Sequence, residues 1–127
     1  MKTPQSLLYS AQHLWAKRSA HDIWEAGITD YAQDLLGDIV FVDAPAVGSI
    51  LKTGEPCGLV ESVKTGSDLH ALVDGEVTEV NQALIDAPEQ INDDPYTAWI
   101  FKFKTSETDL EKKLLSAEAY KALTDNA

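Results

Sequence analysis

The most informative segment of the chain is Leu59-Val60-Glu61-Ser62-Val63-Lys64-Thr65-Gly66-Ser67-Asp68. An apolar run leads into Lys64, a Gly-Ser-Asp cluster follows it, and a second strand-like run leaves, which is the pattern of a β-hairpin. Gly54 and Gly75 lie at similar distances on either side of the lysine, where a chain that folds back needs its next turns. The sequence therefore predicts that Lys64 is held in solvent at the tip of a hairpin.

A lysine on a rigid, protruding turn is what an enzyme needs in order to attach a cofactor to its amine. A fixed stalk also confines the volume that the attached arm can sweep, which raises its effective concentration at a partner's active site. The competing interpretation is an ordinary exposed lysine on an acidic surface. The residues that flank Lys64 decide between the two.

The composition fits one soluble domain, residues 1–127, because this length can bury a full core and 44% of the residues are hydrophobic. Ten basic residues against 21 acidic ones give a formal charge of −11. This charge argues against a nucleic-acid partner, since phosphate binding needs clustered lysine and arginine. We instead expect partners with basic docking surfaces.

The single cysteine, Cys57, cannot form an internal disulfide and suits a reducing compartment. Residues 1–6 lack an apolar signal core, and no apolar run is long enough to span a membrane. We therefore expect a cytoplasmic bacterial protein that does not contact a membrane, in preference to a protein of the mitochondrial matrix. A monomer is the expected oligomeric state.

Short strands separated by glycine turns dominate the chain. The predicted strands are 14–17 and 23–26 as a hairpin, 39–43 as a central strand, and 50–51, 58–63, 69–73, 76–80 and 99–104. This pattern predicts a mainly β fold, a barrel-like sandwich. In the last strand, Trp99, Phe101 and Phe103 should share the buried face, with Ile100 on the opposite face.

The helical signals are short. Thr29 can cap a helix that Gly37 ends, and a second short helix over 81–87 should stop at Pro88, with a loop over 89–96. The core-facing side chains of the first helix are expected to be Ile28, Ala32, Leu35 and Leu36. From residue 106 the pattern is helical again, and Ser116 can cap a last helix over 117–123 that docks through Tyr120 and Leu123.

No residue pattern indicates catalysis or metal binding. Cys57 and His70 could be drawn as a nucleophile and its base, but the surroundings of the thiol are apolar, so a buried strand thiol is the better interpretation. The three histidines, His13, His21 and His70, lack metal-ligand spacing, and no Gly-rich phosphate loop is present. We expect neither a catalytic residue nor a metal site.

The hairpin segment resembles the lipoyl-lysine segment of the glycine cleavage system H protein family, whose pattern is Glu-Ser-Val-Lys followed two residues later by Ser-Asp. The matching residues are Glu61, Ser62, Val63, Lys64, Ser67 and Asp68. Biotin-carrying domains usually place methionine beside their lysine, whereas Lys64 lies between Val63 and Thr65. Residues 27–38 also resemble this family, and the similarity runs from about residue 9 to residue 123.

The resemblance implies a lipoyl/biotinyl-type barrel-sandwich hybrid with short helices and a C-terminal helical segment. It implies covalent lipoic acid on Lys64, as N6-lipoyllysine, in a carrier that is not itself catalytic. The implied partners are glycine decarboxylase, a pyridoxal-phosphate enzyme that loads an aminomethyl group, then aminomethyltransferase, then lipoamide dehydrogenase. A lipoate-attaching enzyme is the remaining partner, and Glu61 and Asp68 are candidates for recognition by it, although carboxylates beside a turn can also simply solvate it.

One departure from the family concerns the cleft that receives the loaded arm. The family usually reads His-Glu-Trp where this chain has His13-Leu14-Trp15. The acid lies near that cleft, so with Leu14 we expect weaker protection of the loaded arm. His13 and Trp15 are possible cleft residues by family position, yet core packing is the commoner role for a tryptophan beside a strand.

Two other functions stay open at this point. A carrier of the same fold could act as a lipoyl relay that donates its cofactor to other enzymes, or serve another redox pathway. From a different class, the chain could be an unmodified interaction module.

Overall fold

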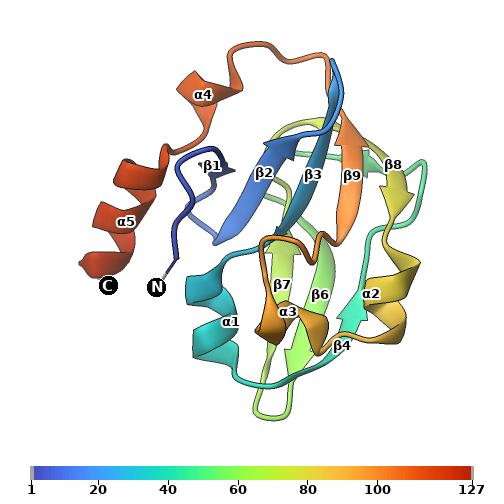
Figure 1. Cartoon of the computed structure of the whole chain (residues 1–127). Coiled ribbons are helices and arrows are strands. Elements are labelled where there is room, and N and C mark those ends of the chain that lie inside the picture. Colours follow the sequence, from blue (N-terminus) through green and yellow to red (C-terminus); the bar gives the residue numbers. More distant parts are fainter. Residues whose placement is uncertain (1, 127) are drawn as a thin grey trace.

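Two antiparallel β-sheets and five short helices make up the computed structural model, which describes residues 2–126 (Figure 1). The six-stranded sheet has the order β1 (Leu8–Tyr9), β2 (Leu14–Arg18), β3 (Ile23–Ile28), β9 (Phe101–Lys104), β8 (Gly75–Val80) and β5 (Ile50–Leu51). The three-stranded sheet has the order β4 (Ile39–Asp43), β6 (Pro56–Ser62) and β7 (Gly66–His70). The mainly β sandwich with short helices is confirmed.

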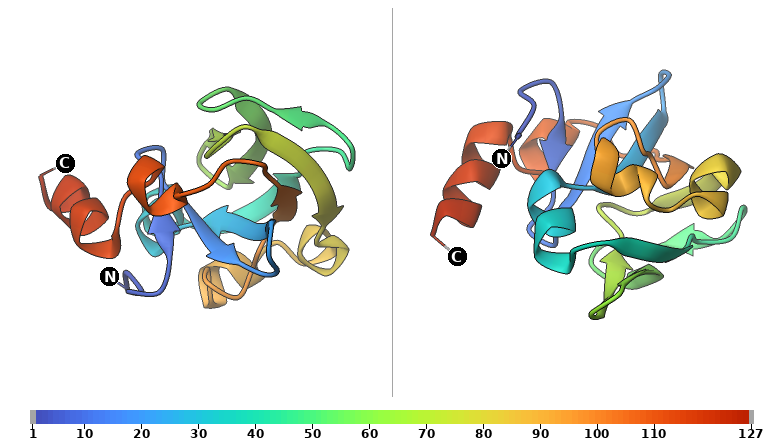
Figure 2. Two further views of the ribbon diagram at one scale, coloured as in Figure 1. Left: turned by 90° about the horizontal axis from the view of Figure 1, so that it is seen from above. Right: turned by 60° about the horizontal axis from the view of Figure 1, so that its bottom comes forward.

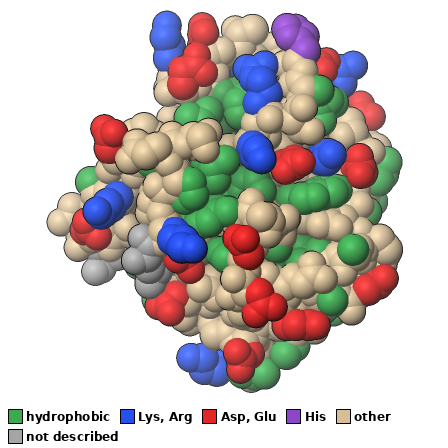
Figure 3. Space-filling model, viewed as in Figure 1, with side chains coloured by type: hydrophobic (Ala, Val, Ile, Leu, Met, Phe, Trp, Pro, Cys, Tyr) green, Lys and Arg blue, Asp and Glu red, His purple; other side chains and the backbone are tan. Residues whose placement is uncertain are grey.

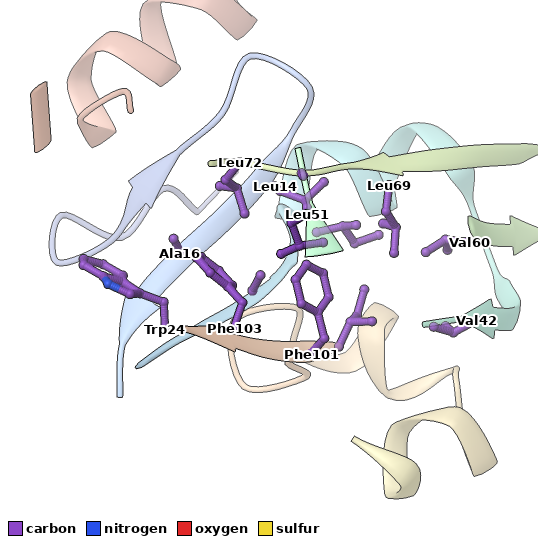
Figure 4. Close-up of a cluster of buried hydrophobic side chains, with 14 of the residues drawn as sticks. Leu14, Ala16, Trp24, Val42, Leu51, Val60, Leu69, Leu72, Phe101 and Phe103 are labelled. Carbon is purple, nitrogen blue, oxygen red and sulfur yellow. The ribbon is translucent and has the colours of Figure 1, made fainter. Parts of the chain in front are cut away.

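The core lies between the two sheets. Figure 4 shows Val42, Val60 and Leu69 from the three-stranded sheet facing Phe101, Phe103 and Leu14 from the larger one. A second buried cluster lies under the C-terminal helix and contains Leu7, Tyr9, Trp15, Ala117 and Tyr120. The two clusters together fasten the small sheet and the C-terminal segment to the large sheet.

The helix α1 (Asp30–Leu36) forms as its local signals predict. The Thr29 side chain accepts a hydrogen bond from the Ala32 amide, and Gly37 ends the helix with φ 86°. One predicted core contact is wrong: Leu35 is 60% exposed, whereas Leu36 is buried. Leu35 lies about 100° around the helix from Leu36 and lines the wall of a cleft instead of the core.

The strand β4 is an edge strand, not the central strand that its apolar run suggested. The central strand of the small sheet is β6, which pairs with β4 on one side and β7 on the other. A β-bulge shifts the register between Ile39 and Phe41. As a result Val40 and Phe41 are 53% and 48% exposed, although the sequence reads as a buried strand.

The segment predicted as a loop over 89–96 contains a short helix, α3 (Gln90–Asp93). Tertiary hydrogen bonds of the Asn92 side chain hold it: Nδ2 donates to Gln33 Oε1 and to the Gly37 carbonyl, and Oδ1 accepts from the Ile39 amide. The preceding helix α2 (Gln82–Asp86) is capped by Asn81 and ends before Pro88, as predicted.

The strand predicted over 99–104 begins only at Phe101. Phe101 and Phe103 are buried as expected, but Ile100 is also fully buried and Trp99 only half-buried. Strand alternation does not reach these two residues, because residues 98–100 are not part of the strand. Asn81 instead holds the Trp99 carbonyl by a side-chain hydrogen bond of 2.8 Å.

The C-terminal segment forms α4 (Leu110–Lys113) and α5 (Ala117–Asp125), the latter capped by Ser116 as predicted. Tyr120 docks α5 by stacking on Tyr9, with ring centroids 4.8 Å apart. Leu123 was expected to help and does not, since it is 41% exposed. Figure 2 shows α5 beside the N-terminal segment at one edge of the molecule. Within residues 2–126, none of the helices has the length and apolar character to cross a membrane.

Candidate functional site

Lys64 lies in the connection between β6 and β7, and the turn of this hairpin points away from the rest of the chain (Figure 1). Ser62 organises the turn from its base. Its hydroxyl oxygen accepts hydrogen bonds from the Lys64 and Thr65 amides at 3.2 and 3.1 Å, and its own amide donates to the Thr65 carbonyl at 2.7 Å. The predicted hairpin tip is confirmed, and the backbone of Lys64 is fixed within it.

A second contact ties the tip to the end of α1. The Val63 amide donates to the Asp38 carbonyl at 3.1 Å. Beside it, Gly37 lies so close to the Lys64 side chain that an added Cβ would stand 3.1 Å from Cε. The lysine side chain is exposed, and its amine forms no ion pair within 4.0 Å among residues 2–126. Its amine is therefore available for chemistry.

The two candidate recognition carboxylates lie on different parts of this hairpin. Glu61 pairs in register with Phe41 on one side and Gly66 on the other, and it is exposed on the outer face of the small sheet. Asp68 pairs with Leu59 and contributes to the rim of a cleft. Figure 3 shows acidic side chains gathered over the lower end of the molecule, where the hairpin lies.

The cleft opens between α1, β2 and the β6–β7 hairpin and has a volume of about 110 Å³. Its walls are mostly apolar, and its polar lining consists of Gln12, His13, Ser67 and Asp68. Leu14 forms part of a wall and is 1% exposed, so the departure from the family pattern lies in the cleft itself. Such a cleft can shield an apolar arm from water.

Of the two other possible cleft residues, the structure brings only His13 to the cleft. Trp15 is fully buried in the second core cluster, where its indole donates to the Pro95 carbonyl at 3.0 Å. Trp15 points to the other face of β2 because side chains alternate along a strand. Of the two interpretations of Trp15, core packing, the commoner role for such a tryptophan, is correct.

His13 takes part in a polar network that the sequence did not indicate. Its Nδ1 lies 2.8 Å from the Tyr120 hydroxyl, which lies 2.8 Å from the Thr29 hydroxyl. Burial lowers the pKa of His13 and raises the pKa of Tyr120 to about 12. The network therefore joins the cleft, the start of α1 and the C-terminal helix through uncharged groups. Residues so far apart in the sequence carry no local signal of this contact.

The surroundings of Cys57 do not activate its thiol. Cys57 is half-buried and not in a disulfide, and burial raises the pKa of its thiol to about 11. Such a thiol is protonated at neutral pH and is a poor nucleophile. No group of His, Cys, Asp and Glu side chains in the described part of the chain has the arrangement of a metal site.

Comparison with known proteins gives a consistent result. The family model described as "Glycine cleavage H-protein" matches residues 7–127. A glycine cleavage system H protein of Methylobacillus flagellatus is 58% identical over 123 residues, covering 97% of this chain and 98% of that protein. One from Escherichia coli is 48% identical over 124 residues, covering 97% and 96%. The crystal structure of an H protein from Mycobacterium marinum superposes with a TM-score of 0.86 at 38% identity, covering 96% of this chain and 98% of that one.

Proposed function

This chain belongs to the glycine cleavage H-protein family, and we propose that it works as that system's carrier with lipoic acid attached through an amide to Nζ of Lys64. The observation that carries this proposal is the position of Lys64. Its side chain is exposed and free of ion pairs within residues 2–126, on a turn whose backbone is pinned by Ser62.

The residues present fit the lipoyl group. The exposed amine can be reached by an attaching enzyme, and the apolar cleft begins beside the same hairpin. When bound, lipoic acid supplies a disulfide that can be opened and later closed again by thiol–disulfide exchange. The protein contributes position: Ser62 and the Val63–Asp38 hydrogen bond hold the stalk, which limits the directions in which Lys64 can present its amine.

The cleft has a protective role in this proposal. Leu14, Ile28, Ala32 and Leu36 give it apolar walls that exclude water. Asp68 places a carboxylate at the rim, which favours a cationic amine over a neutral one. Leu14 offers no second negative charge, and we therefore retain the prediction that protection is weaker here than in a protein with glutamate at this position.

The proposed partners are glycine decarboxylase, aminomethyltransferase and lipoamide dehydrogenase, together with the lipoate-attaching enzyme, and the chain itself performs no catalysis. With a formal charge of −11, it is suited to partners with basic docking surfaces. The relatives compared above are named for the glycine cleavage system, which favours this role over a lipoyl relay or an unmodified interaction module.

A decarboxylase assay tests the proposal. Lipoylated protein should support exchange of labelled bicarbonate into the carboxyl group of glycine by purified glycine decarboxylase, and the Lys64→Arg variant should not. A lipoylated protein that gives no exchange, while an established H protein does, would favour the relay instead. Failure of the chain to accept lipoate at all would favour the interaction module.

A further inference from the structure

The exposed hydrophobic side chains of this protein gather near Lys64. Four of the seven large exposed ones in residues 2–126 lie on the segments that bracket the lysine, namely Leu35, Val40, Phe41 and Val63. Leu35 lines the cleft, but the other three do not. Single exposed apolar residues are ordinary, whereas several on neighbouring segments mark an interaction surface.

The pairing of β4 with β6 puts Phe41 on the outer face of the small sheet. Val42 and Val60 are paired, and both point into the core (Figure 4). Phe41 is therefore on the opposite face, with its register partner Glu61. The bulge leaves Val40 exposed as well, so two successive apolar residues of β4 are in solvent.

Val63, 67% exposed, directly follows the last residue of β6, and its amide donates to the Asp38 carbonyl just before β4. Acidic groups surround the apolar ones. Glu61 and Asp43 are exposed on β6 and β4, and Asp38, also exposed, holds the Val63 amide through its carbonyl. An apolar centre with a charged rim is the usual anatomy of a protein–protein interface.

We propose that this outer face, with Val40 and Phe41 at its centre, Val63 on the adjoining hairpin turn and Asp38, Asp43 and Glu61 at its rim, is the docking surface for the lipoate-attaching enzyme. The inference rests on the proposed function of Lys64. The complementary surface on that enzyme is an apolar patch bordered by lysine or arginine side chains.

The position of the face selects this partner among those proposed. The attaching enzyme must bring its reaction centre to Nζ of Lys64 itself, so its contact area is centred on the hairpin tip. Enzymes that use the attached arm meet its far end, a whole lipoyl chain away from the sheet. Val40 and Phe41 keep 53% and 48% of their surface in solvent, and a partner that covers them during modification accounts for this exposure.

The test compares Phe41→Ser with Val47→Ser in the otherwise intact chain. Val47 is 61% exposed and lies past the other end of β4, so it is a matched control for the loss of an exposed apolar side chain. The measurement is kcat/KM for lipoylation by a purified lipoate–protein ligase, followed by intact mass. Phe41→Ser should reduce kcat/KM about tenfold, mainly through KM, and Val47→Ser should not.

A charge variant tests the rim separately. Asp43→Lys should lower kcat/KM most strongly at low ionic strength, whereas Asp125→Lys on α5 should leave it unchanged. Thermal unfolding must show all variants folded. Equal rates for Phe41→Ser, Val47→Ser and wild type would overturn the docking surface while leaving the proposed function intact. A wild-type protein that accepts no lipoate would instead overturn the proposed function.

Discussion

Gly37 lies directly beneath the side chain of Lys64: a Cβ added to Gly37 would stand 3.1 Å from Cε of the lysine. The same glycine ends α1 with φ 86° and ψ −153°. That combination of backbone angles is accessible almost only to glycine. One residue thus ends the helix and leaves room for the lysine side chain.

Replacing Gly37 by alanine should destabilise the fold by about 1–3 kcal/mol, because an L side chain is strained in this backbone conformation. It should also displace the Lys64 side chain. Urea unfolding measures the first effect. Gly66→Ala is the control, since a Cβ at this position would meet its neighbours only at 3.4 Å or beyond. This variant should lose little free energy of unfolding. Equal losses for the two variants would contradict this account of Gly37.

Replacing Ser62 by alanine should loosen the hairpin tip. The change leaves the Lys64 and Thr65 amides without the hydroxyl that accepts from them, at a cost of about 1–2 kcal/mol. Hydrogen exchange at these two amides should become faster, while exchange in the core stays slow. Ser67→Ala, on an exposed residue of β7, is the control and should leave both amides protected. Unchanged exchange in Ser62→Ala would show that the hydroxyl does not hold the turn.

The protein should lose stability in mild acid through His13. Burial lowers the pKa of His13 below 6.5, the value of the unfolded chain, so the neutral form is the one that the fold favours. The stabilisation that neutral His13 gives the fold is complete at pH values above the pKa of this histidine in the unfolded chain. It declines as pH falls, because His13 takes up a proton more readily in the unfolded chain than in the folded one.

Unfolding measured from about pH 7.5 to about pH 5.5 checks this decline. His13→Asn should reduce its slope, and asparagine tolerates the positive φ of 72° at this position. His21→Asn, on an exposed residue, should keep the wild-type slope. A His13→Asn slope equal to that of the wild type would assign the acid sensitivity elsewhere.

The Leu14→Glu substitution should prolong the life of the loaded form. Leu14 lies in the cleft wall at 1% exposure, so a carboxylate there would stabilise a protonated amine inside the cleft. The measurement is the rate of ammonia release from loaded protein. The control is Leu14→Gln, because glutamine has nearly the shape of glutamate without its charge. It should not slow the release of ammonia. An unchanged half-life in Leu14→Glu would remove Leu14 as a cause of weak protection.

The features that the sequence predicted correctly have local causes. The hairpin tip follows from the polar residues around Lys64, with Ser62 holding the turn, and α1 follows from a threonine cap and a terminal glycine. Each signal lies within a few residues of the structure that it specifies. The predicted position of Lys64 therefore agrees with the structure.

The features that the sequence missed depend on distant contacts. An apolar run such as that of β4 occurs in central strands and in edge strands. The structure shows that β4 is an edge strand because it pairs with one strand only, β6. The short helix α3 depends on Asn92 reaching Gln33 and Gly37. The link from His13 to Tyr120 joins opposite ends of the chain. None of these pairings leaves a periodic pattern in the sequence.

The most direct test of the central claim is the intact mass of the protein after incubation with lipoate, ATP and a lipoate–protein ligase, beside a Lys64→Ala control. We predict one added lipoyl group on the wild type, mapped by peptide analysis to Lys64, and none on the control. An unmodified wild type, under conditions that modify an established H protein, or an adduct that persists in the control, would contradict the assignment of Lys64 as the lipoyl attachment site.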